Sequence, residues 1–462
     1  MGGVGKTELA LQYALRNQHN YPGGLCWFPV RGLDLGTQVV NFARTELGLT
    51  IPDQLEFNQQ VEYCWGHWPE GTALIVLDDV VDYEDINSYL PPAQPRFKVL
   101  ITSRENPGPL IKHIDLDLLS PEAALELLRS LVDKQLETKR IDNELTEAQA
   151  LCEWLGYLPL GLELVGRYLA LHRTLTIAKV QKRLEKKKLE AKALLSQKQG
   201  QFKPQLGVAA AFELSWEDLE DCPEAQQLGC RLSLFAQAPF DWFLVECCVR
   251  ETEDEEEWEE EQEELEELRV REAWPTANRY LVNRNLLQLT EQQTYRLHQL
   301  IREFFLTKLA QLPEADSYKQ SFCQVMVAKA KEIPQTPTRD QITGVTPAIP
   351  HLVEAATVLT DWLRDEDLPW PFVGLGKFYK GQGTYDEAER WCKQCLEIAR
   401  SRLGENHPDV ATTLNNLGLL YFSMGQYDQA EPLYVQALEM TKQLLGENHP
   451  AEATTLNNLA AL

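Results

Sequence analysis

Two hydrophobic patterns divide the chain. In the first part, short apolar runs at 24–30, 73–77 and 98–102 are separated by stretches in which apolar residues recur at helical spacing. Continuous apolar runs of this length are typical of parallel strands buried on both faces, and strands that alternate with helices form a doubly wound sheet. A further strand is expected over 113–116. The pattern predicts an α/β domain over residues 1–118, with helical segments dominating the rest of the chain.

The C-terminal part of the chain repeats itself. The sequence Gly-Glu-Asn-His-Pro begins at Gly404 and again at Gly446, which gives a period of 42 residues (404 to 446). Small residues where helices touch, and aromatic residues between them, are typical of tetratricopeptide helix pairs. The unit between the two copies has this spacing at Gly418, Tyr421, Ala430, Tyr434 and Ala437.

A Cys-x-x-Cys pair, Cys392 and Cys395, falls in the preceding unit. In the register of the repeat these thiols hold the positions of Tyr434 and Ala437. We therefore interpret them as core packing rather than as a redox or zinc site. The repeats are predicted over 366–462.

The N-terminus carries a candidate phosphate loop, which ends in Gly5-Lys6-Thr7 and leads into an apolar helical pattern. Glycines such as Gly3 and Gly5 let backbone N–H groups turn inward around a phosphate, and the helix N-terminus adds its positive dipole end. Lys6 would supply a charge toward the β- and γ-phosphates, and the Thr7 hydroxyl would ligate Mg²⁺. The alternative is a flexible glycine-rich terminus.

Charged residues follow two of the expected strands. Asp78 and Asp79 come directly after the run at 73–77, and Arg104 follows the run at 98–102. Ligands of open α/β sheets bind at the carboxyl ends of the strands. Asp78 would hold Mg²⁺, Asp79 would polarise an attacking water and Arg104 would sense a γ-phosphate. The alternative for Asp78 and Asp79 is an acidic turn after a strand, and the alternative for Arg104 is an ordinary surface arginine.

The order of these motifs resembles the NB-ARC family of STAND nucleotide switches. Residues 2–7 resemble its Walker A motif, 77–79 its Walker B motif and 101–104 its sensor strand, while Gly156-Tyr157-Leu158-Pro159-Leu160 resembles its GLPL motif. The resemblance implies binding of ADP or ATP with Mg²⁺, with Pro159 near the adenine. Without the resemblance, Pro159 is a proline in the first turn of a helix.

The resemblance also implies the domains that follow. It predicts a helical domain over 119–205, a winged-helix domain over 206–312 and a helical linker over 313–365. Leu297-His298-Gln299 falls where the family has its MHD motif, so His298 would contact the β-phosphate of ADP. The sequence departs from the motif at Gln299, where the family commonly has Asp. The alternative for His298 is an ordinary core or surface histidine.

The 42-residue period resembles that of kinesin light chain repeats, which often follow NB-ARC modules in bacteria. Such repeats form an α-solenoid that presents a concave surface to protein or peptide partners. The chain begins inside the phosphate-loop motif, without the strand that leads into it, and stops within a repeat. We therefore expect a fragment truncated at both ends.

Charge argues against a general nucleic-acid or membrane binder. The formal net charge is -26, from 44 basic and 70 acidic residues, and this excess repels phosphate backbones and anionic lipids. The segment 251–268 is strongly acidic and is interpreted as an insertion that forms a solvated face or a docking patch for a basic partner. The basic stretch 179–188 is interpreted as a solvated helix.

The cysteine content and the apolar runs bear on the cellular compartment. The ten cysteines lack the dense spacing of secreted scaffolds and indicate reduced thiols. The sequence has no run of the ~20 apolar residues that cross a bilayer, so a cytoplasmic protein is expected.

The leading hypothesis is a signalling switch controlled by ADP and ATP, at most a slow regulatory ATPase, that self-assembles in its ATP state. A scaffold with a degenerate, nucleotide-free N-terminal module is the alternative. A transcription regulator that uses the winged helix on DNA is disfavoured because this region contains the acidic segment.

Overall fold

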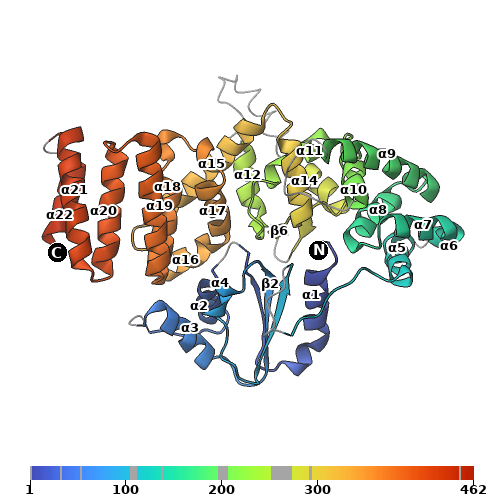
Figure 1. Cartoon of the computed structure of the whole chain (residues 1–462), viewed down its shortest axis with the longest axis horizontal. Coiled ribbons are helices and arrows are strands. Elements are labelled where there is room, and N and C mark those ends of the chain that lie inside the picture. Colours follow the sequence, from blue (N-terminus) through green and yellow to red (C-terminus); the bar gives the residue numbers. More distant parts are fainter. Residues whose placement is uncertain are drawn as a thin grey trace.

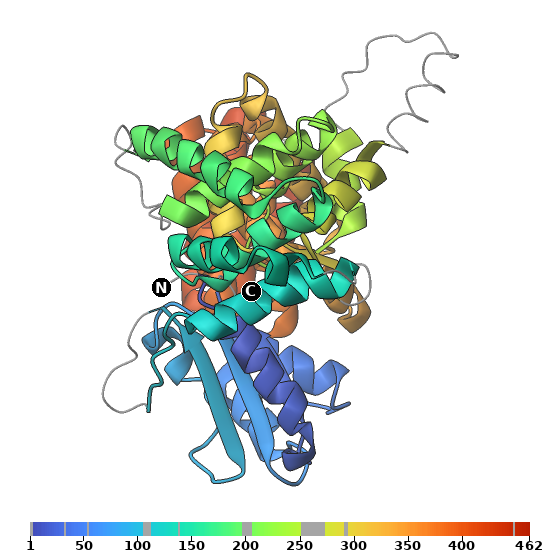
Figure 2. The same cartoon turned by 90° about the vertical axis from the view of Figure 1, so that its right-hand side faces the viewer.

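The computed structural model describes residues 3–31, 34–52, 55–104, 112–136, 139–195, 206–250, 273–290, 294–446 and 449–462. The acidic segment 251–268 lies outside these ranges. In two views at right angles, an N-terminal sheet unit lies beneath an extended helical part (Figure 1, Figure 2). Among the described helices, none is long and apolar enough to cross a membrane.

The N-terminal sheet has three parallel strands in the order β1-β2-β3, namely β1 (Leu25–Pro29), β2 (Ala73–Val80) and β3 (Phe97–Ser103). Three of the predicted strands are thus confirmed, and β2 extends through Asp78 and Asp79. The strand predicted over 113–116 is wrong: residues 112–120 form no regular element. Ile114 is 82% exposed and Leu116 packs against the helical core rather than against the sheet, so this short apolar pattern forms no strand.

Helices cover both faces of this sheet because β2 alternates its side chains between them. On one face, α1 (Lys6–Asn17) packs on Leu74 and Val76. On the other face, Ile75 and Leu77 lie under α2 (Leu35–Thr45) and α3 (Phe57–Gly66). This is the α/β sandwich that the alternating pattern predicted.

A helical region follows the sheet. Within the predicted range 119–205 it consists of α5 (Pro121–Leu136), α6 (Arg140–Asn143), α7 (Leu145–Trp154), α8 (Pro159–Leu171) and α9 (Ile177–Leu195). Pro159 is the first residue of α8, where its missing N–H has no intrahelical partner to lose.

A second, small sheet lies in the next part of the chain. Its strands β4 (Phe240–Asp241), β5 (Gln288–Leu289) and β6 (Thr294–Arg296) are antiparallel, in the order β4-β6-β5. The helices around it are α10 (Leu206–Glu217), α11 (Pro223–Leu232), α12 (Trp242–Arg250), a helix over 273–283 and α14 (Gln299–Leu309).

Every described element of the C-terminal part is a helix. Three lead into the repeats: α15 (Ala315–Glu332), α16 (Arg339–Val345) and α17 (Ile349–Thr357). The repeats are α18 (Trp370–Gln382), α19 (Tyr385–Leu403), α20 (Pro408–Ser423), α21 (Tyr427–Leu445) and α22 (Pro450–Ala460), which stand side by side in Figure 1. One continuous apolar core runs from α5 to α21.

The repeated Gly-Glu-Asn-His-Pro sequence ends one helix and begins the next. Gly404 ends α19 with a φ of +92°, a value that favours glycine. His407 then caps α20, because its Nδ1 accepts a hydrogen bond from the Asp409 N–H, and Pro408 is the first helical residue. Gly446, His449 and Pro450 repeat this arrangement at α22.

Packing between repeat helices agrees with the predicted register. A Cβ on Gly418 would lie 2.8 Å from the Tyr434 ring, and a Cβ on Gly376 would lie 3.2 Å from the Cys392 sulfur. The Cys392 thiol therefore packs where Tyr434 packs one repeat later, as expected for a core position.

Candidate functional site

The candidate phosphate loop turns sharply at two glycines. Gly3 and Gly5 have φ values of +77° and +91°, which L residues rarely adopt. The helix α1 begins immediately afterwards at Lys6, so its free N–H groups and positive dipole end face the loop. This is the local geometry that phosphate binding requires.

The loop meets the carboxyl end of β2. The Thr7 hydroxyl donates to Oδ1 of Asp78 at 2.8 Å, and the Thr102 hydroxyl donates to the same oxygen at 2.6 Å. Thr102 in turn accepts from the backbone N–H of Asp79 at 2.9 Å. The two expected Mg²⁺ ligands, Thr7 and Asp78, are thus brought together, and Asp78 is fully buried.

The second aspartate faces two arginines. Oδ2 of Asp79 lies 3.1 Å from Nη1 of Arg31, and its Oδ1 lies 3.9 Å from Nε of Arg104. Asp79 has a φ of +58°, unusual for a non-glycine residue, which re-aims its side chain at the end of the strand. Arg31 follows β1 as Arg104 follows β3, so both guanidinium groups come from the carboxyl edge of the sheet.

Residues of the second sheet and α14 close this edge. The Gln299 side-chain oxygen accepts from Nη1 of Arg31 at 2.7 Å and also from Arg104. The Gln299 amide nitrogen donates to Glu303, one turn along α14, at 2.7 Å. Gln299 therefore bridges the ends of β1 and β3 to α14.

An arginine from the second sheet reaches the buried aspartate. Nη2 of Arg296, the last residue of β6, lies 3.3 Å from Oδ2 of Asp78. Asp78 therefore has a hydroxyl pair on one oxygen and a guanidinium on the other. This arrangement satisfies a fully buried carboxylate that would otherwise be costly.

The GLPL-like segment lies against the loop from the other side. The backbone N–H of Leu160 donates to the Gly3 carbonyl at 3.4 Å. A Cβ on Gly3 would lie 3.3 Å from Leu160 and 3.5 Å from Leu300, and one on Gly5 would lie 4.0 Å from Pro159. Pro159 is thus placed beside the phosphate loop, between α1 and the helical region.

His298 lies half-buried at the start of α14. Its Nδ1 accepts a hydrogen bond from the Leu300 N–H at 3.2 Å, so the neutral ring carries its proton on Nε2. Burial, followed by the positive charges of Arg104 and Arg296, lowers the pKa of His298 to about 4. At neutral pH this imidazole is therefore an uncharged hydrogen-bond donor.

The charges at this edge suit an anion. Burial, followed by the charge of Arg104, lowers the pKa of Lys6, while Asp79 and Asp78 oppose that shift. Four cationic side chains meet here, Lys6, Arg31, Arg104 and Arg296, against the two carboxylates. A bound phosphate would relieve this mutual repulsion, and the Thr7 hydroxyl with the Asp78 carboxylate offers the oxygen ligands that Mg²⁺ prefers. The residues present therefore fit a phosphate group with a divalent cation.

Three members of this cluster were not predicted from the sequence: Arg31, Thr102 and Arg296. Arg31 follows an expected strand just as Arg104 does, so the strand-end argument would have found it. Arg296 lies on β6, far from the sheet edge in sequence, and only tertiary contacts reveal its partner.

Taken together, the fold is that of an α/β phosphate-loop domain joined to helical repeats. Comparison with known families agrees: the model of the NB-ARC domain matches residues 1–137, and that of the tetratricopeptide repeat matches 367–443 and 409–462. In this chain a match to the NB-ARC domain is thus followed by matches to the tetratricopeptide repeat.

Two curated relatives are similar to part of the chain. The Regulatory protein AfsR of Streptomyces griseus is 30% identical over 249 residues, which cover 52% of this chain and 24% of that protein. The Regulatory protein AfsR of Streptomyces coelicolor is 28% identical over 249 residues, covering 52% of this chain and 23% of that protein. The matched part thus spans about a quarter of these relatives.

Proposed function

We propose that the protein is a signalling switch that binds ADP or ATP with Mg²⁺ and senses a protein partner through its repeats. The observation that carries the proposal is the meeting of four elements at one edge: the phosphate loop, the ends of the β strands, the start of α8 and the start of α14. A ligand held there would touch all of them. The relatives are named regulatory proteins, which agrees with a regulator.

Each residue has a part in this proposal. The loop N–H groups and Lys6 bind the phosphates, Thr7 and Asp78 hold the cation, and Pro159 lies against the adenine. The neutral His298 ring donates from Nε2 to a β-phosphate oxygen of ADP. Mg²⁺, when bound, would neutralise the charge between the phosphates. Asp79 and Arg104 are assigned to slow hydrolysis, which resets the switch.

The region over 206–312 is proposed to be a winged-helix domain that moves during switching. Its attachment to the sheet edge includes the pair Arg296–Asp78 and the bridge from Gln299 to Arg31 and Arg104. Because Arg31 and Arg104 are held by Gln299, they are engaged in the closed arrangement and would be released toward a γ-phosphate when α14 leaves. A ligand shifts such an equilibrium only by its difference in affinity for the two states.

The first repeat helix, α18, and the helix α16 that precedes the repeats both contact the α/β domain. The Gln382 side-chain amide donates to the Asn41 side chain at 3.3 Å, and Arg339 donates to the Arg44 carbonyl at 2.7 Å. Asn41 and Arg44 lie on α2, which begins four residues after Arg31. A partner bound to the repeats could therefore alter the nucleotide site through α2. Self-assembly in the ATP state and a cytoplasmic location belong to this proposal.

The second candidate is a protein-binding scaffold with no nucleotide. The pair Arg296–Asp78 favours it, because a guanidinium already neutralises the carboxylate assigned to Mg²⁺. Denaturing the purified protein and identifying any released ligand by chromatography separates the two. The switch predicts adenine nucleotide that is lost in Lys6→Ala; a parent protein free of nucleotide that also fails to take it up supports the scaffold.

A further inference from the structure

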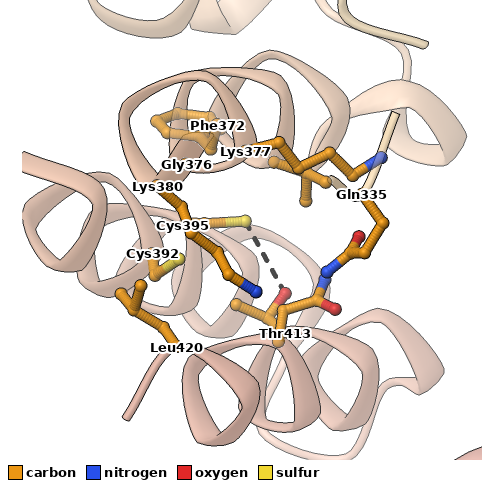
Figure 3. Close-up of a pocket in the computed structure, with 11 residues that line it drawn as sticks. Gln335, Phe372, Gly376, Lys377, Lys380, Cys392, Cys395, Thr413 and Leu420 are labelled. Carbon is orange, nitrogen blue, oxygen red and sulfur yellow. Dashed lines mark hydrogen bonds between the residues drawn. The ribbon is translucent and has the colours of Figure 1, made fainter. Parts of the chain in front are cut away.

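A cavity of about 360 Å³ lies where the region of the second sheet meets the helices that lead into the repeats. It is far larger than the cavity beside Cys395 and Thr413 within the repeats (Figure 3), whose volume is about 30 Å³. We propose that the larger cavity binds a small organic cation, in which an apolar ring system carries one ammonium group. The inference goes beyond the proposed function and depends on neither the nucleotide site nor the repeats.

Two parts of the chain build the walls of this cavity. Phe243 and Leu244 come from the start of α12, next to Asp241 at the end of β4. The facing wall comes from the end of α15, from α16 and from the residues on either side of α16. Its apolar side chains are Ile333, Pro334, Pro337, Val345 and Pro347. Figure 1 shows α12 and α15 as neighbours near the middle of the molecule.

The size and the lining of the cavity suit a ring system. Small-molecule sites have volumes from about 300 Å³ upward, and a cavity of about 150 Å³ already holds benzene, so two fused rings fit here. Leu244 and Ile333 are 6% and 2% exposed, whereas the Phe243 ring is 61% exposed. A flat ligand can therefore rest on buried apolar side chains and stack in an offset manner on the Phe243 ring.

One charge in the cavity has no counter-charge. Lys329 and Glu332 neutralise each other, since Nζ lies 2.9 Å from Oε1. The Asp241 carboxylate accepts from the Phe243 N–H at 2.8 Å, and no cationic side chain among the described residues pairs with it. The positive end of α12 offsets only about half of a unit charge. The remaining negative charge is exposed and can pair with the ammonium group of a ligand.

The charge of the whole chain and the prolines of the wall narrow the choice of ligand. With a net charge of -26, the chain attracts cations and repels anions. Pro334, Pro337 and Pro347 have no N–H to donate to an extended peptide, so the wall offers little to a peptide backbone. These features favour a small cation over an anion or a peptide.

A ligand in this cavity would bridge two regions of the chain. Asp241 pairs with Thr294 across the second sheet, two residues before Arg296, while the facing wall belongs to the helices that precede the repeats. A ligand that contacts both walls binds the folded chain alone. It should therefore raise the melting temperature as its concentration increases.

The test uses saturation-transfer NMR with two probes of similar shape and opposite charge, tryptamine and 3-indolepropionate. The parent protein is expected to show saturable binding of tryptamine at millimolar concentration or below, at least fivefold tighter than that of 3-indolepropionate. In Asp241→Asn this preference should fall below twofold. Asparagine is as good a helix cap as aspartate, so α12 keeps its first turn.

A second pair of variants tests the place of binding. A Cβ on Gly344 of α16, at the cavity wall, would meet no atom within 4 Å, and the same holds for Gly66 at the end of α3. Leucine is favoured over glycine in helices, so both Gly344→Leu and Gly66→Leu should fold. Gly344→Leu should weaken tryptamine binding at least tenfold because the side chain occupies the cavity, whereas Gly66→Leu should bind as the parent does.

Four outcomes would overturn the inference. They are no saturable binding of tryptamine by the folded parent, parental affinity in Gly344→Leu, an unchanged preference for the cation in Asp241→Asn, and tighter binding of a blocked Gly-Trp-Lys-Gly peptide than of tryptamine. The last result would mean that the cavity takes a side chain of a peptide. Circular dichroism shows whether each variant is folded.

Discussion

Arg296 and Asp78 join two sheets that are far apart in the sequence. The guanidinium of Arg296, at the end of β6, lies 3.3 Å from the buried carboxylate of Asp78, at the end of β2. Thr7 of the phosphate loop donates to the other oxygen of that carboxylate. A side chain from outside the sheet unit therefore stands at the position where the proposed function requires a divalent cation.

Removing this arginine is expected to make the site more receptive to Mg²⁺. In Arg296→Ala no guanidinium competes for Asp78, so the Mg²⁺ concentration at half-maximal ATP binding should fall several-fold. Titration of a fluorescent ATP analogue with Mg²⁺ measures it. Arg129→Ala, which removes an exposed pair with Asp142, is the matched control. An unchanged Mg²⁺ midpoint in Arg296→Ala would show that the pair does not oppose the cation.

Gln299 offers a test of whether α14 holds the sheet edge in a closed arrangement. In Gln299→Ala, Arg31 and Arg104 lose their shared acceptor, and α14 loses its bridge to the sheet edge. Hydrogen bonds to charged groups contribute about 1.5–3 kcal/mol each, so release of bound ADP should be at least tenfold faster. Stopped-flow displacement of a fluorescent ADP analogue measures the rate. Glu303→Gln leaves the acceptor oxygen of Gln299 in place and should keep the parental rate; equal rates in all three proteins would contradict a closing role for Gln299.

Substitution of Gly3 by alanine is expected to be harmful for two separable reasons. An alanine at Gly3 is strained at a φ of +77° and brings a Cβ within 3.3 Å of Leu160. Gly48 has a φ of +65° with open space around it, so Gly48→Ala carries the backbone strain alone, about 1–2 kcal/mol. Gly3→Ala is expected to lower the melting temperature more than Gly48→Ala and to weaken nucleotide binding, which Gly48→Ala leaves unchanged. Calorimetry measures the melting temperature and the affinity for nucleotide. Equal changes of both quantities in the two variants would refute the contact between the phosphate loop and α8.

Acid is expected to destabilise the protein through His298, which is half-buried, and His351, which is buried. Burial lowers the pKa of His298 and of His351 to about 4, below the ordinary value of about 6.5. Between these values the unfolded chain binds protons that the folded chain does not. The free energy of unfolding therefore falls as the pH drops from about 6.5 toward 4, by at most about 1.4 kcal/mol per pH unit for each histidine, and these groups contribute no pH dependence well above 6.5.

Urea midpoints between pH 7.5 and 5 measure this effect. His298→Gln should show a shallower loss of stability with falling pH than the parent, whatever its stability at pH 7.5. His19→Gln, which changes an exposed histidine, should keep the parental slope. A parental slope in His298→Gln would mean that folding does not lower the pKa of this imidazole.

Local patterns predicted the elements well, and contacts between distant elements less well. The run at 73–77 predicted β2 because a strand buried on both faces needs continuous apolar residues. The rule that ligands bind at the carboxyl ends of such strands then predicted that Asp78 and Thr7 lie together. The pattern at 113–116 misled because a strand also needs a partner, which no short run reports. Arg296 carries no local signal, since its role comes from the approach of β6 to Asp78.

The measurement that bears most directly on the central claim is calorimetric titration of the protein with ADP, and with ATP and Mg²⁺, in the parent and in Lys6→Ala. The account predicts saturable binding at one site per chain in the parent, and a loss of affinity of at least tenfold in Lys6→Ala without loss of the folded state. Absence of binding in a folded parent already free of nucleotide, or equal affinity in Lys6→Ala, would contradict it.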